Sequence, residues 1–165
     1  MSLSKRSVIH IAVIILVGAG FFSTGGTPAF AESWSIKSGQ NIGVLLPAES
    51  RKLSDGSTYV SGGSKQLVVT EDSSYPITGQ SMECRWICKI DDDGADGACV
   101  TMCAGVDEDG DLFSFRALSF GPGKYEVGPG TGKYEGATGG GTFEAGPVDD
   151  PALSYVVWKG TLKLK

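Results

Sequence analysis

Histidine is almost absent from this chain, since its 165 residues include a single one, His10, in an apolar N-terminal segment. A protein without that segment has no histidine to act as the base in nucleophilic catalysis. Positive charge is also scarce, with 14 Lys and Arg against 19 Asp and Glu. Loss of Lys5 and Arg6 with the segment leaves 12 basic residues and a formal charge of −7. This charge disfavours nucleic acid and anionic membrane surfaces as partners.

The N-terminal segment has the pattern of a signal peptide. Two basic residues precede an apolar stretch over residues 8–22, and the tripeptide Ala-Phe-Ala at 29–31 precedes Glu32. A charged start, a short apolar core and a small-x-small end are typical of export signals. We therefore predict that residues 1–31 are removed, that no stable membrane span remains, and that the protein is periplasmic or secreted. An uncleaved N-terminal anchor is the alternative.

Helical periodicity is weak after the segment, and short β-branched or alternating runs are frequent. Residues 32–165 are enough for one domain, which we predict to be all-β, a barrel or a sandwich. The expected strands are residues 33–37, 41–46, 57–61, 65–71, 79–90, 98–106, 112–120, 123–127, 140–145 and 154–165. The breakers expected between strands are Pro47, Asp55-Gly56, Gly62-Gly63, Tyr75-Pro76, Asp93-Gly94, Asp109-Gly110 and Gly146-Pro147. Alternation in the last strand predicts one core-facing set, namely Val156, Trp158, Gly160, Leu162 and Leu164.

Four cysteines follow the spacing C-x₃-C-x₁₀-C-x₃-C at Cys84, Cys88, Cys99 and Cys103. Their position within expected strands and the predicted export favour disulfides over a zinc site. A hairpin that turns at Asp93-Gly94, a favoured type I′ turn, places Cys84 opposite Cys103 and Cys88 opposite Cys99. We predict these pairs, called the outer and the inner disulfide below, while the other two pairings stay open.

Glycine is concentrated in residues 121–144, GPGKYEVGPGTGKYEGATGGGTFE. The similar hexapeptide motifs GPGKYE and GTGKYE begin nine residues apart, a spacing that suits successive strands or a strand and a following loop. The segment GPGTGK is similar to a nucleotide phosphate loop, but Val127 and Tyr134 stand where that motif needs a glycine and a serine or threonine. A glycine-rich β-turn is the favoured interpretation.

This region also carries a family resemblance. Residues 130–143, GTGKYEGATGGGTF, with DEDGD at 107–111 before them and WKGTLKL at 158–164 after them, resemble bacterial secreted proteins related to the allene oxide cyclase and dirigent barrels. The most specific part is the turn GTGKY-x-G-x-x-G, whose glycines are Gly130, Gly132, Gly136 and Gly139. The resemblance implies a small, calycin-like antiparallel β-barrel of about eight strands with a central cavity. We expect the strand over residues 154–165 to close this barrel.

Two acidic clusters, at residues 91–97 and 107–111, suggest calcium, which prefers carboxylate ligands. An EF-hand loop that began at Asp107 would have Leu112 and Leu118 at its sixth and twelfth positions instead of Gly and Glu. We therefore interpret both clusters as solvated hairpin tips and expect neither a metal nor a cofactor.

The sequence assigns no catalytic or ligand-binding residue. The acid and base candidates are interpreted as strand surface, and they are Glu83, Glu126, Glu135, Glu144, Tyr125 and Tyr134. The aromatics interpreted as packing are Trp86, Trp158, Phe113, Phe115, Phe120 and Phe143. We favour a non-enzymatic exported barrel that binds a small apolar ligand or a protein partner. The alternative is an isomerase or radical-coupling guide, like the allene oxide cyclases and dirigent proteins, acting on a substrate in the cavity.

Overall fold

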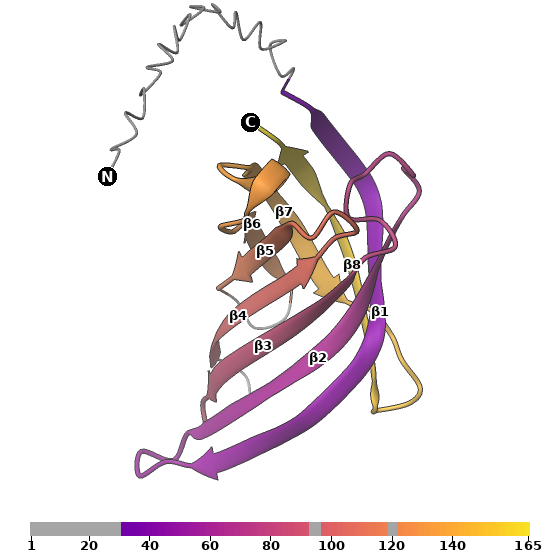
Figure 1. The fold of residues 1–165 in the computed structure, drawn as a ribbon. Helices are drawn as coiled ribbons and strands as arrows, with labels where there is room; N and C mark the ends of the chain where they lie inside the picture. The colour runs from indigo at the N-terminus through magenta and orange to yellow at the C-terminus, as the bar shows by residue number, and fades with distance from the viewer. Residues whose placement is uncertain (1–30, 93–96, 119–121) are drawn as a thin grey trace, which may run out of the picture.

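The computed structural model describes residues 31–92, 97–118 and 122–165, and these form one closed antiparallel barrel (Figure 1). Each strand pairs with the next along the chain, and the last pairs with the first. The strands are β1 (Ser33–Lys52), β2 (Thr58–Thr70), β3 (Ser81–Ile90), β4 (Gly97–Val106), β5 (Leu112–Ala117), β6 (Gly123–Val127), β7 (Thr138–Ala145) and β8 (Leu153–Lys163). The predicted eight-stranded barrel and its closure through the C-terminal strand are confirmed. Within the three described segments, no helix is long and apolar enough to span a membrane.

Three of the predicted interruptions are wrong, because β1 runs through residues 38–40 and Pro47 and β2 runs through Gly62-Gly63. β1 continues across two β-bulges, one between Ile36 and Gly39 and one between Leu46 and Glu49. Pro47 lies in the second bulge, where its missing N–H removes no regular ladder bond. A bulge bends a strand without ending it, so the long strand can follow the curved wall of the barrel.

The predicted break at Gly62-Gly63 lies inside β2, where glycine makes room for an aromatic ring. A Cβ on Gly62 would collide with the indole of Trp86, which lies directly opposite on β3. The same arrangement recurs at two other cross-strand pairs, Gly39–Trp158 and Gly105–Phe113. These glycines are therefore packing positions under large side chains and not turns.

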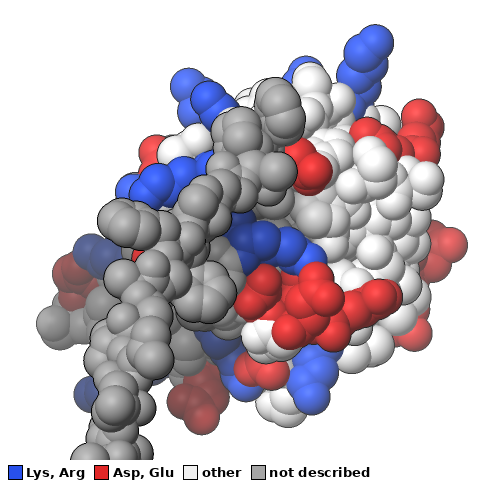
Figure 2. Space-filling model, turned by 45° about the horizontal axis from the view of Figure 1, so that its top comes forward, with Lys and Arg blue, Asp and Glu red and all other residues white. Residues whose placement is uncertain are grey.

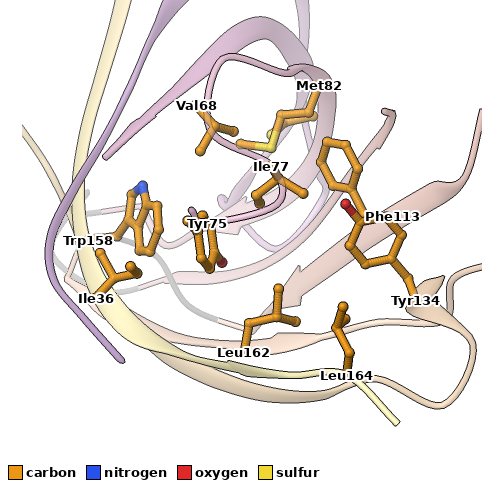
Figure 3. Close-up of a cluster of buried hydrophobic side chains, with 11 residues drawn as sticks. Ile36, Val68, Tyr75, Ile77, Met82, Phe113, Tyr134, Trp158, Leu162 and Leu164 are labelled. Carbon is orange, nitrogen blue, oxygen red and sulfur yellow. The ribbon is translucent and has the colours of Figure 1, made fainter. Parts of the chain in front are cut away.

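A plug closes the end of the barrel at which the described chain begins and ends. It consists of residues 75–77 in the connection between β2 and β3, where Tyr75 is 3% and Ile77 1% exposed. The ring of Tyr75 lies edge-on to Trp34, with 6.3 Å between ring centroids, and 5.8 Å from the ring of Trp158. Figure 3 shows Tyr75 and Ile77 among the other buried side chains of the core, which include Ile36, Val68, Met82, Phe113, Leu162 and Leu164. The core is thus concentrated at this end.

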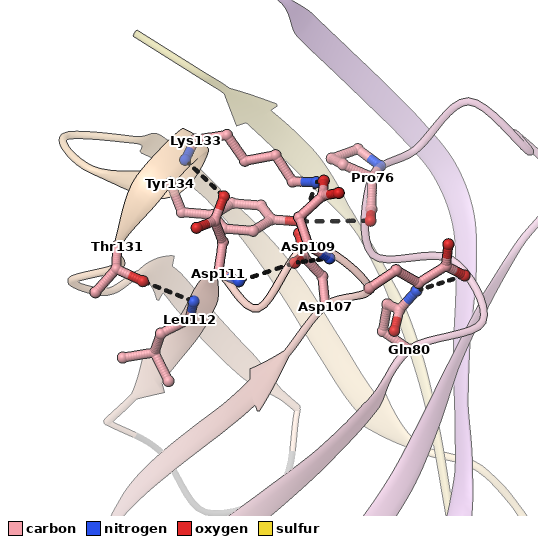
Figure 4. Close-up of polar contacts among 10 residues, drawn as sticks. Pro76, Gln80, Asp107, Asp109, Asp111, Leu112, Thr131, Lys133 and Tyr134 are labelled. Carbon is pink, nitrogen blue, oxygen red and sulfur yellow. Dashed lines mark hydrogen bonds and ion pairs between the residues drawn. The ribbon is translucent and has the colours of Figure 1, made fainter.

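An ion-pair cluster of Asp107, Asp109 and Lys133 joins two connections at the same end (Figure 4). The Lys133 Nζ lies 2.7 Å from Asp107 Oδ2 and 2.6 Å from Asp109 Oδ2. The Asp107 side chain is only 1% exposed, and its Oδ1 accepts hydrogen bonds from the backbone N–H of Asp109 and Asp111, both at 3.0 Å. Burial by itself raises the pKa of Asp107, but the hydrogen bonds from Lys133 and the backbone outweigh it and leave that pKa below its ordinary value.

Asp107 is therefore not part of a solvated hairpin tip, and that prediction is wrong for this residue. The ammonium of Lys133 contacts both Asp107 and Asp109, so the chain itself supplies a positive charge between these carboxylates. Among the described residues, no three His, Cys, Asp or Glu side chains are arranged to hold a metal ion. Viewed with this end turned forward, the surface has acidic and basic side chains side by side next to a broad uncharged area (Figure 2).

β3 and β4 pair in the predicted register, with Cys84 opposite Cys103 and Cys88 opposite Cys99. The structure contains both the outer and the inner disulfide. The Asp93-Gly94 turn from which the register was inferred lies outside the described residues, as do residues 1–30 of the predicted signal peptide and Phe120. On β8 and just after it, Trp158, Leu162 and Leu164 are buried, as the alternation predicted.

Candidate functional site in the barrel lumen

The barrel encloses a cavity of about 240 Å³ beside the plug, and all eight strands contribute to its wall. One end of the cavity meets the buried Tyr75 and Ile77. Leu45 and Arg116, which also line it, are exposed and lie toward the opposite end of their strands. The cavity therefore reaches the surface at the end away from the plug. A central cavity is what the family resemblance implied.

One side of the cavity is an aromatic wall made of Phe115, Tyr125, Phe143 and Trp158, from the four consecutive strands β5 to β8. Tyr125 lies edge-on to both neighbouring rings, with centroid distances of 5.8 Å to Phe115 and 6.2 Å to Trp158. Its hydroxyl reaches across β7 to Gly160, where a Cβ would block it. Edge-to-face contacts of this kind hold the rings in defined orientations, so the wall is a preformed apolar surface.

The tyrosines of the cavity are kept in their neutral form. Burial raises the pKa of Tyr125 above its ordinary value of 10, and burial together with the neighbouring Tyr125 raises the pKa of Tyr75. Both hydroxyls therefore keep their protons near neutral pH. They can donate hydrogen bonds or a proton, but they are poor general bases.

The other side of the cavity is a polar wall made of Asn41 on β1, Ser64 and Gln66 on β2, and Ser154 on β8. Gln66 Nε2 donates to Ser154 Oγ at 2.9 Å across Gly43, which pairs with both residues and has no side chain to separate them. The indole N–H of Trp158 donates to Asn41 Oδ1 at 3.0 Å and so links the two walls. The polar wall carries amides and hydroxyls but no charge.

The acid and base candidates are mostly remote from the cavity. Tyr125 alone among them lines it, while Tyr134 is buried beside the ion-pair cluster, where its hydroxyl lies 3.4 Å from the carbonyl oxygen of Pro76 in the plug. The four glutamates are exposed on the outside of the barrel, namely Glu83, Glu126, Glu135 and Glu144. Two of them form ion pairs with arginines, Glu83 with Arg85 and Glu126 with Arg116. The interpretation of the glutamates as surface residues agrees with the structure. It is wrong for Tyr125, which lines the cavity, and for Tyr134, which is 2% exposed.

The interpretation of the aromatics as packing alone is likewise incomplete. Phe113 belongs to the core, but four of the others line the cavity, namely Trp86, Trp158, Phe115 and Phe143. Sequence reasoning also missed the plug and the polar wall. The sequence indicates only a strand breaker at Tyr75-Pro76, and nothing local distinguishes Ser64 and Gln66 from their outward-facing neighbours Lys65 and Leu67.

The turn glycines position structural residues and do not line the cavity. Gly132 and Gly136 have positive φ angles of 53° and 72°, at the start of the short 3₁₀-helix η1 (Gly132–Tyr134) and just after it. Gly139 has a φ of 143° in β7, and a Cβ on Gly130 would collide with Tyr134. The predicted β-turn is thus a 3₁₀ turn that directs Lys133 and Tyr134 into the barrel end. The second copy of the repeated motif, GTGKYE, forms a loop after β6 and not another strand.

The comparisons with known proteins find solved structures of similar fold but no match by sequence. No family model and no curated protein matches this chain. The pterocarpan synthase dirigent protein GePTS1 superposes with a TM-score of 0.51 and 13% identity, covering 81% of this chain and 91% of its own. The chain has a dirigent-like fold. A second pterocarpan synthase dirigent protein, PsPTS1, superposes with the same TM-score and 9% identity, covering 79% of this chain and 94% of its own.

Proposed function

We propose that the protein is an exported, non-enzymatic barrel that binds one small, mainly apolar ligand in its lumen. The observation that carries this proposal is the cavity of about 240 Å³, bounded by the plug and by the aromatic wall. Ligand sites of proteins typically measure about 300–1,000 Å³, so the cavity suits a compound of one or two rings. Flat rings can stack or pack edge-on against the aromatic wall.

The charge distribution supports an uncharged occupant and no acid–base chemistry. Among the described residues, Arg116 is the one charged residue that lines the cavity, and its guanidinium pairs with Glu126 through a 2.7 Å contact. An ionised ligand would lose its hydration in the lumen without gaining a partner. The carboxylates that could act as general bases lie outside the barrel.

Export is supported by the two disulfides, which persist in oxidising compartments. N-terminal sequencing of exported material is expected to start at Glu32. A mature chain that still carried residues 8–22 would contradict cleavage of a signal peptide.

Binding can be tested with toluene and naphthalene by titration calorimetry. Val156 lines the cavity, whereas its neighbour Val157 does not, so the variants Val156→Phe and Val157→Phe add the same ring on the inside or the outside. We expect both compounds to bind the wild type and Val157→Phe, and to bind Val156→Phe at least about 10-fold more weakly, because the added ring fills the lumen. No measurable binding to the wild type, or equal binding to both variants, would contradict the proposal.

The second candidate is a dirigent-like or allene oxide cyclase-like guide that orients a reactive substrate in the cavity. It is supported by the dirigent-like fold and by the neutral hydroxyl of Tyr125 in the lumen, which could stabilise developing negative charge. Membership of the bacterial secreted group and the relation to allene oxide cyclases are part of this proposal. A stereochemical bias in oxidative phenol coupling that requires the protein and is lost in Tyr125→Phe would favour the guide. The same product mixture with and without protein would count against it.

A further inference from the structure

Three lysines line one hollow on the outer surface of the barrel. The hollow measures about 440 Å³, and its lysines are Lys37 on β1, Lys124 on β6 and Lys159 on β8, all exposed. On β6 and β8 the neighbouring residues Tyr125 and Trp158 line the lumen, so the lysines beside them point outward. The barrel wall therefore separates this hollow from the lumen.

The strand register explains why the lysines are neighbours. Thr142 on β7 pairs with Lys124 on one side and with Lys159 on the other. Adjacent strands are about 4.8 Å apart, so the long side chains of both lysines can reach one small ion above the Thr142 hydroxyl. The first β-bulge of β1 adds Lys37, because it places two residues of β1 opposite Lys159. Four adjacent strands thus contribute to one row of polar side chains.

The positive charge of this row is not neutralised within the described part of the chain. Lys52, Lys89 and Lys133 each form ion pairs with aspartates, whereas none is recorded for the three lysines of the hollow. Among the described residues, Glu144 is the one carboxylate that lines the hollow, and no ion pair joins it to a lysine. The hollow therefore carries an excess of positive charge on a protein that is acidic overall.

We propose that this hollow binds a doubly charged oxyanion, phosphate or sulfate, as a free ion or as an ester group of a larger molecule. Lysine ammonium groups bind such oxyanions as point charges, and the Thr142 hydroxyl can donate a further hydrogen bond. An anion between the lysines also relieves their mutual repulsion. Two negative charges gain more than one from a site with excess positive charge. The site lies outside the lumen and goes beyond the proposed function.

The test is a heteronuclear NMR titration of the exported protein with inorganic phosphate in low salt at about pH 8, where phosphate carries two charges. We expect the largest shift changes at the backbone amides of Lys124, Thr142 and Lys159. Lys124→Met and Lys159→Met should each weaken phosphate at least about 3-fold, and Thr142→Val about 2-fold. The matched control is Lys65→Met, on an exposed position of β2 outside the hollow, which should change the affinity less than about 1.5-fold.

Glu144→Gln supplies a readout of opposite sign. It should tighten phosphate about 2- to 3-fold, because it removes the one carboxylate that repels the anion within the hollow. Glu71→Gln, exposed and outside the hollow, is its control and should have almost no effect. Acetate should bind at least about 3-fold more weakly than phosphate, because it carries a single charge.

Methyl phosphate distinguishes the two sources of the oxyanion. Binding at least as tight as that of phosphate supports an ester group, and weaker binding supports the free ion. Equal losses in Lys65→Met and Lys159→Met, equal effects of the two glutamate variants, or shift changes spread over lysines elsewhere would show an unspecific attraction and overturn the inference. Toluene affinity should be the same in all these variants. Toluene binding without phosphate binding would overturn this inference alone, and phosphate binding without toluene binding would overturn only the proposed function.

Discussion

Replacing Lys133 by Met should destabilise the barrel far more than the loss of an ordinary surface lysine. The ammonium of Lys133 is the partner of Asp107 Oδ2, whose side chain is 1% exposed. Removing one member of a buried ion pair typically costs about 3–5 kcal/mol, because the remaining charge stays buried without compensation. Lys133 itself is 33% exposed, so water can enter and reduce the loss. We therefore expect Lys133→Met to lower the free energy of unfolding by about 2 kcal/mol.

The exposed pair of Lys52 and Asp92 provides the control, because both side chains are 71% exposed at a separation of 3.3 Å. Lys52→Met should cost less than about 1 kcal/mol. In the double variant Asp107→Asn/Lys133→Met, the asparagine keeps the acceptor for the two backbone N–H groups and removes the buried charge. The double variant should therefore be more stable than the sum of the single effects predicts, by about 1–2 kcal/mol.

Urea denaturation at neutral pH measures these differences, and its pH dependence supplies a further check. The folded-state pKa of Asp107 is lowered, so the stabilisation should be present above its unfolded pKa of about 4 and be lost as the pH falls through the folded value. The folded-state pKa of Lys133 is raised, so the stabilisation should be lost as the pH rises through that value above about 10. Equal losses in Lys133→Met and Lys52→Met, or strict additivity in the double variant, would refute this account of the cluster.

Three further predictions address the core, the covalent links and the cavity. Trp158→Ala should cost about 3–5 kcal/mol, since the indole is 8% exposed and its removal leaves a larger cavity; an unchanged thermal melt would contradict this. Replacing the cysteines of either disulfide by Ser should cost less than half of the roughly 2–5 kcal/mol lost when both are removed, because one bridge already restricts the same hairpin; denaturation of the three variants measures this. In an ultraviolet pH titration, Tyr75 and Tyr125 should ionise at a higher pH than free tyrosine, and stability should fall above about pH 10, where the unfolded chain ionises first; ionisation of every tyrosine near pH 10 in the folded protein would be inconsistent with their burial.

Local patterns determined the class of fold and the pairing of β3 with β4. The equal spacing of the cysteines on both sides of Asp93-Gly94 admits one symmetric hairpin register, and a register shift by one residue would turn every cysteine pair to opposite faces. The alternation on β8 likewise predicted that Trp158 and Leu162 face the core. In these places the information lies within one hairpin or one strand, where period and turn chemistry suffice.

At some glycines and prolines, the prediction from the local sequence is wrong. Gly62 looks like a turn residue in the sequence, and its role under Trp86 depends on which residue of the neighbouring strand lies opposite. Pro47 resembles a strand breaker in the sequence. The bulge that tolerates it exists only because β2 pairs with β1 on both sides of it. The cross-strand register therefore decides whether a glycine or proline at these positions ends a strand or lies within it.

The cavity was decided by the tertiary structure alone. Ser64 and Gln66 alternate with Lys65 and Leu67, so the strand pattern does not show which face points inward until the barrel closes. The plug likewise depends on a connection that folds back over the barrel end, where Tyr75 meets rings contributed by strands far away in the chain. A cavity of this kind requires eight strands to converge, and their convergence follows from long-range pairing and burial, which no short stretch of sequence specifies.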